Sequence, residues 1–141
     1  MAYLAASPVA IGVLSLLNVA GLTALVSTRI YEGVPRSATF PYVWIEIFDE
    51  TDVRGFGTGT LPEIDVRVHA FVSTETNRGM KEAQTIIAKV IELLKDKDVT
   101  VSGWTQCGKV FYDRTTALPN EVVEGVKVNE LVAHFRIYVE S

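Results

Sequence analysis

The chain has 141 residues, of which 48% are hydrophobic and 21% are charged, and its formal net charge is -4. This composition excludes an intrinsically disordered protein, and a chain of this size, which buries roughly two thirds of its unfolded surface, is expected to form a single domain over residues 1–141. The acidic balance argues against a protein that binds nucleic acid through clustered Lys and Arg. Cys107 is the only cysteine, which excludes an intrachain disulfide.

The first 28 residues contain no Asp, Glu, Lys, Arg or His. A membrane span needs about 20 apolar residues, so a membrane anchor over residues 2–26 is one interpretation. No basic residue precedes the apolar run, which argues against a signal peptide, and Asn18 and Gly21 interrupt it. Ser7 followed by Pro8 is typical of a helix N-terminus. We therefore expect a buried helical segment of a globular domain, divided into two short helices at Asn18.

A buried strand is predicted after this segment. Val43, Ile45 and Ile47 alternate with aromatic and acidic side chains, which gives the two-residue period of a strand. Residues 49–60 are rich in glycine and acidic residues and lack apolar periodicity, so they are predicted to form a long hairpin loop that can order against another protein. The contact residues proposed in this loop are Asp49, Glu50, Asp52, Arg54 and Phe56.

The second half of the chain predicts further strands and one helix. Apolar residues occupy alternate positions in residues 64–73 and again in residues 130–140, so each segment is predicted to be a strand with one core face. Residues 80–94 place apolar side chains at three- and four-residue steps, as an amphipathic helix does. Residues 99–112 are predicted to hold one or two short strands, and residues 113–124 a second connecting loop. The contact residues proposed in that loop are Asp113 and Arg114.

Together these elements predict an α+β fold. We expect an antiparallel sheet with two main helices packed on one face, as a two-layer sandwich. The other face stays uncovered and carries more aromatic side chains than a solvated face needs, which favours a protein partner. The residues proposed to make contacts on this face are Arg67, Phe71, Arg136 and Tyr138.

No catalytic, cofactor or metal site is predicted. His69 and His134 fall on the non-core faces of two strands and could be combined with Asp65, but a metal site needs three or four ligands, so solvated or interface histidines are favoured. Residues 54–59 resemble a phosphate-binding loop, yet a strand follows in place of the required helix. Cys107 is interpreted as a small structural side chain.

The most informative segment is R-I-Y-E-G-V-P-R-S-A-T-F-P-Y-V-W-I-E-I, residues 29–47. The apolar N-terminal segment ends at Tyr31, a turn around Gly33 follows, and Pro41 opens the buried strand. A glycine-rich loop, a long strand, an amphipathic helix and a final long strand come after it. This order resembles the tail terminator or tail completion family of long-tailed bacteriophages, and the likeness covers nearly the whole chain.

The resemblance implies a structural virion protein that is not an enzyme. Proteins of the family form a six-fold ring on the end of the tail tube, stop its polymerisation and present a surface to the head connector. For this chain it implies a homohexamer at the head-proximal end of the tail, assembled in the host cytoplasm, with the tail tube protein and the head connector or stopper protein as partners. Genome DNA would pass through the ring without specific binding, and no membrane would take part.

Two alternatives stay open at this point. A head-tail connector or another adaptor of the virion would share the fold class and the lack of catalysis. A small membrane-associated protein would use the apolar N-terminal segment as its anchor.

Overall fold

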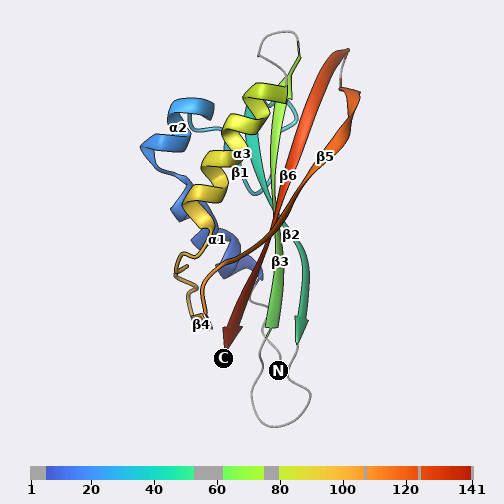
Figure 1. Cartoon of the computed structure of the whole chain (residues 1–141). Coiled ribbons are helices and arrows are strands. Elements are labelled where there is room, and N and C mark those ends of the chain that lie inside the picture. Colours follow the sequence, from blue (N-terminus) through green and yellow to red (C-terminus); the bar gives the residue numbers. More distant parts are fainter. Residues whose placement is uncertain (1–5, 53–61, 75–79, 107, 124, 141) are drawn as a thin grey trace.

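The structure is a computed structural model of the chain and describes residues 6–52, 62–74, 80–106, 108–123 and 125–140. The elements are α1 Ala6–Leu17, α2 Ala20–Val26, β1 Ile30–Tyr31, β2 Tyr42–Asp52, β3 Pro62–Ser73, α3 Met80–Leu94, β4 Thr105–Gln106, β5 Phe111–Val123 and β6 Val126–Glu140. Figure 1 shows the helices together on one side of a strongly twisted sheet. The hand and extent of such twist follow from the stereochemistry of L-residues.

The sheet has the strand order β1-β2-β3-β6-β4, and β5 also pairs with β6. β1 runs parallel to β2, whereas the other pairs, β2–β3, β3–β6, β4–β6 and β5–β6, are antiparallel. The α+β class is confirmed, but the sheet is mixed and not purely antiparallel, and three helices are present among the described residues. The parallel pair arises because residues 32–41 carry the chain back to the end of the sheet where β1 starts.

The N-terminal segment forms α1 and α2, with the break at Asn18 that the sequence predicts. The side chains that these helices bury completely are Val9, Val13, Leu17, Leu22 and Val26. They belong to the same hydrophobic cluster as the inner faces of α3 and the sheet. In the described part of the chain no single helix is long and apolar enough to cross a membrane. The pair Ser7–Leu17 and Ala20–Val26 meets the length and composition test only jointly, and it is bent by 87°.

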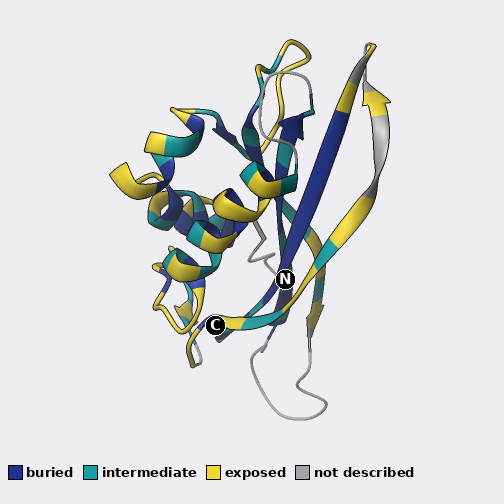
Figure 2. Ribbon diagram, turned by 45° about the horizontal axis from the view of Figure 1, so that its top comes forward, coloured by how far each residue is buried: buried dark blue, intermediate teal, exposed yellow. Residues whose placement is uncertain are grey.

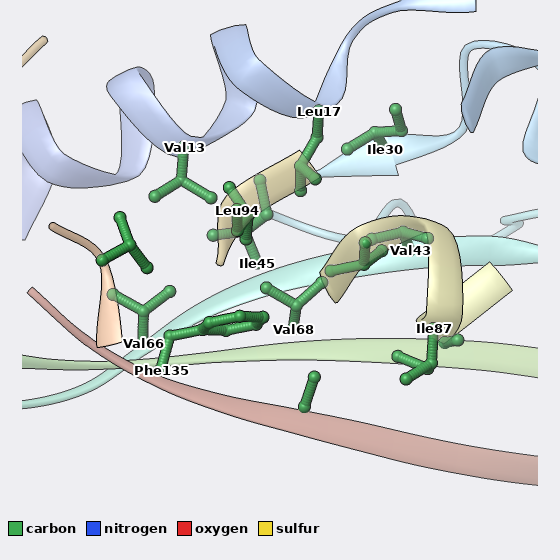
Figure 3. Close-up of a cluster of buried hydrophobic side chains, with 14 of the residues drawn as sticks. Val13, Leu17, Ile30, Val43, Ile45, Val66, Val68, Ile87, Leu94 and Phe135 are labelled. Atoms are coloured by element: carbon green, nitrogen blue, oxygen red, sulfur yellow. The ribbon is translucent and has the colours of Figure 1, made fainter. Parts of the chain in front are cut away.

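One hydrophobic core lies between the helices and the apolar face of the sheet (Figure 3). Every second residue of β3 from Ile64 to Val72 is fully buried, and Figure 2 shows an unbroken buried stretch along β6. From β6, Phe135 enters the core beside Val66, while Leu94 of α3 closes it from the helical side (Figure 3). Full burial of such a side chain contributes about 1.5 to 3 kcal/mol, so this layer supplies the main driving force for folding.

Two segments that were predicted as loops are strands in the structure. β2 continues as far as Asp52, so Asp49 and Glu50 belong to a strand. β5 spans Phe111–Val123 and contains Asp113 and Arg114. Both segments are strands because their backbones pair with β3 and β6, and an antiparallel sheet tolerates charged side chains on a solvated face. Local apolar periodicity does not reveal such pairing with a distant segment.

Gly12 allows α1 to approach the segment that follows α3. A Cβ atom at this position would meet the carbonyl oxygen of Thr100 and a methyl group of Val99. Val99 is itself buried and belongs to the hydrophobic core, and a backbone carbonyl cannot turn aside as a flexible side chain can. The contact between α1 and this segment therefore requires a residue without a side chain.

We predict that Gly12→Ala lowers the free energy of unfolding by about 1 to 3 kcal/mol, the usual range for an overpacked core site. Gly33→Ala is the matched control, because a Cβ atom there has no neighbour within 4 Å. Urea denaturation of the two variants and the wild type measures the difference. Equal denaturation midpoints for both variants would show that α1 does not lie as close to Thr100 as described.

Candidate interaction surface

The sheet face turned away from the helices, called the bare face below, is organised in rows across four strands. Directly opposed residues of an antiparallel pair stand on the same face, so the strand register defines the rows. From β2 to β5 the rows are Tyr42, Phe71, Glu130, Leu118; then Trp44, His69, Val132, Thr116; then Glu46, Arg67, His134, Arg114; and last Asp49, Asp65, Arg136, Phe111. One end of the face is aromatic and the other is charged.

The four residues predicted to make contacts on the uncovered face all lie on the bare face. Arg67, Phe71 and Arg136 belong to the rows, and Tyr138 stands opposite Glu63 beyond the last row. All four are half-buried and so remain accessible to a partner. Their geometric placement agrees with the sequence, while their role in contacts stays a prediction.

Several of the residues proposed as loop contacts lie on strands in the structure. Asp49 and Asp113 lie on strands, where Asp49 accepts a hydrogen bond from Thr51 Oγ1 at 3.0 Å and Asp113 pairs with Arg114 at 2.8 Å. Asp113 also lies 3.7 Å from the Arg136 guanidinium, so this acid group belongs to the charged end of the bare face. Glu50 and Asp52 also lie on β2, whereas Arg54 and Phe56 lie outside the described residues, as does Cys107.

His69 connects three strands through its two ring nitrogens. Nδ1 lies 2.5 Å from Glu130 Oε2 of β6, and Nε2 lies 2.8 Å from Glu46 Oε1 of β2. Each ring nitrogen of His69 therefore faces one carboxylate oxygen, and the bridge links the three strands through side chains. The side chains of His69 and Glu130 are each 9% exposed, so this bridge is shielded from water. His69 is thus a buried group that bridges three strands, and of the two predicted alternatives, a solvated or an interface histidine, the structure contradicts the solvated one.

An aromatic stack holds the imidazole of His69 in place. The ring of Trp44 lies 4.5 Å from it and that of Phe71 lies 5.9 Å from it, both nearly parallel to it. Tyr42 continues the stack, 4.8 Å from Phe71. The indole nitrogen of Trp44 also donates to the Glu32 carbonyl at 3.0 Å. These contacts connect the side chains at the aromatic end of the bare face across β2 and β3.

At the charged end, two arginines lie over exposed aromatic rings near opposite edges of the sheet. The guanidinium of Arg67 lies 3.3 Å from the ring centroid of Phe48, and that of Arg136 lies 5.8 Å from the centroid of Phe111. Phe48 is 53% exposed and Phe111 is 49% exposed. Arg67 Nε is buried and has no hydrogen-bond partner in the described part of the chain. The stacking leaves both phenyl rings open to a further contact.

His134 lies within the charged end and is buried. Its Nε2 lies 3.2 Å from Thr116 Oγ1. Burial lowers the pKa of His134 below its ordinary value, and the positive charges of Arg114 and Arg67 lower it further, against smaller opposite effects of Asp65 and Asp113. The ring is therefore neutral in the folded protein at neutral pH. Like His69, it is buried and therefore not a solvated histidine.

Among the described residues, the bare face presents aromatic and charged side chains that can contact another protein. Within them, no group of three or more His, Cys, Asp or Glu side chains is arranged to hold a metal ion. Sequence reasoning missed the two acids that bind His69 and the pair Phe48 and Phe111. Glu130 and Phe48 stand in apolar strand patterns like many residues without such a role, so only the register between distant strands could have identified them.

The fold is shared with a known virion chain. A chain of the solved structure described as "Virion of native gene transfer agent (GTA) particle" superposes with a TM-score of 0.78 and 23% sequence identity, over 99% of this chain and 100% of that chain. Residues 13–140 match the family described as Tail completion protein gp17. The chain therefore belongs to this tail completion family, and it is a structural, virion-associated protein of phage tails. No curated protein matches the chain.

We predict that His69→Leu lowers the free energy of unfolding by about 3 to 5 kcal/mol, because it leaves the buried Glu130 carboxylate without its partner. The double variant His69→Leu with Glu130→Leu should recover most of that loss, since apolar residues of similar size can replace a buried ion pair. Urea denaturation of both variants measures the two values. A double variant as unstable as the single one would mean that the carboxylate is not held by His69.

The lowered pKa of His134 makes stability depend on pH. The unfolded chain binds a proton near pH 6.5 while the folded chain does not, so the stability that His134 contributes is complete above about pH 6.5 and is lost as the pH falls through its folded pKa. His134→Gln keeps a polar partner for Thr116 and cannot titrate.

Between about pH 7.5 and about pH 5 the wild type should therefore lose more stability than His134→Gln. Urea denaturation at several pH values, at constant ionic strength, gives the two profiles. All other titratable groups are common to both proteins, so a difference between the two profiles reports on His134. Parallel profiles would show that His134 titrates alike in the folded and unfolded chains.

Proposed function

We propose that this chain forms a homohexameric ring that caps the tail tube, ends its polymerisation and joins the tail to the head connector. The observation that carries the proposal is the family match over residues 13–140, whose description is that of a tail completion protein. The shared fold with a chain of a gene transfer agent virion is consistent with it. The same proposal gives the chain its place, at the head-proximal end of the tail.

A ring of this kind needs two different contact surfaces on each copy. A heterologous interface joins one patch of a subunit to another patch of its neighbour and closes when the rotation between copies divides the circle. The bare face and the sheet edges supply such surfaces, because they combine exposed phenyl rings with charged groups of both signs. The helices cover the opposite face.

The charge of the chain fits a ring through which DNA passes. The net charge is -4, and the arginines of the bare face are close to acid groups: Arg67 lies 3.7 Å from Asp65 and Arg136 lies 3.6 Å from Glu63. Strong binding of DNA requires positive charges that are free to replace counterions on the phosphates. The ring therefore lets genome DNA pass without specific binding.

Tail length distinguishes this function from that of an adaptor on the head side. We predict that particles made without the chain contain tails of uncontrolled length that do not join heads, because growth of the tube is then not stopped. Negative-stain electron microscopy measures the length distribution, and supply of the intact chain from a second gene copy is the control that should restore it. Tails of uniform length that merely fail to join heads would contradict the terminator function and favour a head-side adaptor.

A further inference from the structure

The sheet has two open edges, and this matters if the chain forms the proposed ring. On one side β5 pairs with β6 only. On the other side β1 covers β2 at Val43 and Trp44 only, so no strand in the described part of the chain pairs with the outer side of β2 from Ile45 to Asp49. Edges of this kind expose unpaired backbone N–H and C=O groups, which can pair with a strand of another chain.

Exposed apolar side chains gather on the same two strands. Of the seven large hydrophobic residues that are exposed among the described residues, four belong to β2 or β5: Phe48, Phe111, Leu118 and Val122. A long edge that is both apolar and unpaired is a liability for a monomer, and proteins normally protect such edges. Phe48 belongs to β2 and the other three to β5, so both edge strands carry apolar side chains that a second copy can cover.

The β2 edge also has room for an added strand. A shallow hollow of about 370 Å³ lies along it, and its lining residues are Ser7, Ala10, Glu32, Trp44, Ile45, Glu46 and Ile47. Helix α1 forms one wall of this hollow and the strand itself forms the floor. A strand that paired with β2 would enter the hollow and satisfy the backbone groups that are open there.

The strand directions of the two edges are compatible. β2, β3, β6 and β5 alternate in direction, so β5 runs antiparallel to β2. In a ring whose axis runs along the strands, rotation from one copy to the next does not change the direction in which any strand runs. A β5 strand placed beside β2 of the next copy therefore continues the antiparallel alternation of the sheet.

We propose that, in the ring, the free edge of β5 in one copy pairs with the open part of the β2 edge in the next copy, so that one sheet runs continuously through all copies. The inference rests on the proposed ring and names its subunit interface. The two edges are different surfaces of the same chain, as a heterologous interface that closes into a ring requires.

The register of the rows gives this interface a specific contact. Phe111 stands in the same row as Asp49, and Phe48 is the neighbouring residue at the irregularity of β2. In the proposed pairing Phe111 of one copy lies beside Phe48 of the next. An arginine lies on one side of each phenyl ring. Contact between the two phenyl rings covers exposed surface of both side chains.

A photocrosslinking experiment on assembled particles tests the interface. Phe111→p-benzoylphenylalanine places a reactive aromatic group at the proposed contact, and the same group at Ile11, which is 59% exposed on α1, is the control. Within one copy β5 and β2 are three strand spacings apart, about 14 Å, so a link between them joins two copies. Mass spectrometry locates the linked residue.

We expect irradiation of the Phe111 variant to give a ladder of linked copies, with the link in residues 45–52, and the Ile11 variant to give no link to that segment. If the particles hold a ring of this chain but Phe111 links to any other segment or protein, the edge pairing is wrong while the ring stands. If the particles hold no ring of this chain, the proposed function fails and the edge pairing fails with it.

Discussion

The alternation of β3 and β6 is the constraint on which the rest of the structure depends. These strands pair from Glu63 with Tyr138 to Ser73 with Val128, and their register sends the alternate apolar side chains of both strands, such as Val66 and Phe135, to the helical face. A shift by one residue would move the whole apolar set to the other face, so burial under α1, α2 and α3 fixes the register. The same register assembles the bare face, and the placement of His69, Arg67 and Arg136 follows from it.

Much of the fold could be predicted from the sequence because it depends on local patterns. The break at Asn18, the helix that buries Ile87 and the core face of β3 follow from apolar spacing within one segment. The extension of β2 through Asp49 and the strand that contains Arg114 could not be predicted in this way. These segments are strands because distant backbone groups pair with them, and their polar side chains lie on a solvated face that leaves no apolar period.

The candidate surface, like the fold, could be predicted only in part from the sequence. Alternation alone assigns Arg67, Phe71, Arg136 and Tyr138 to the non-core face, since it requires no knowledge of neighbouring strands. The bridge from Glu46 through His69 to Glu130 depends on three segments that are far apart in the chain, so no local pattern reveals it. The bridge and the aromatic stack connect strands on a face that no helix covers among the described residues, and this face remains open to a partner.

The central claim of this account is that the chain forms a ring at the head-proximal end of the phage tail. Cryo-electron microscopy of particles that contain the chain tests it most directly. The account predicts a single six-fold ring, built from copies with the fold described above, seated between the last layer of tube subunits and the head connector. Density for the chain along the tube, inside the head or in a layer without rotational closure would contradict it.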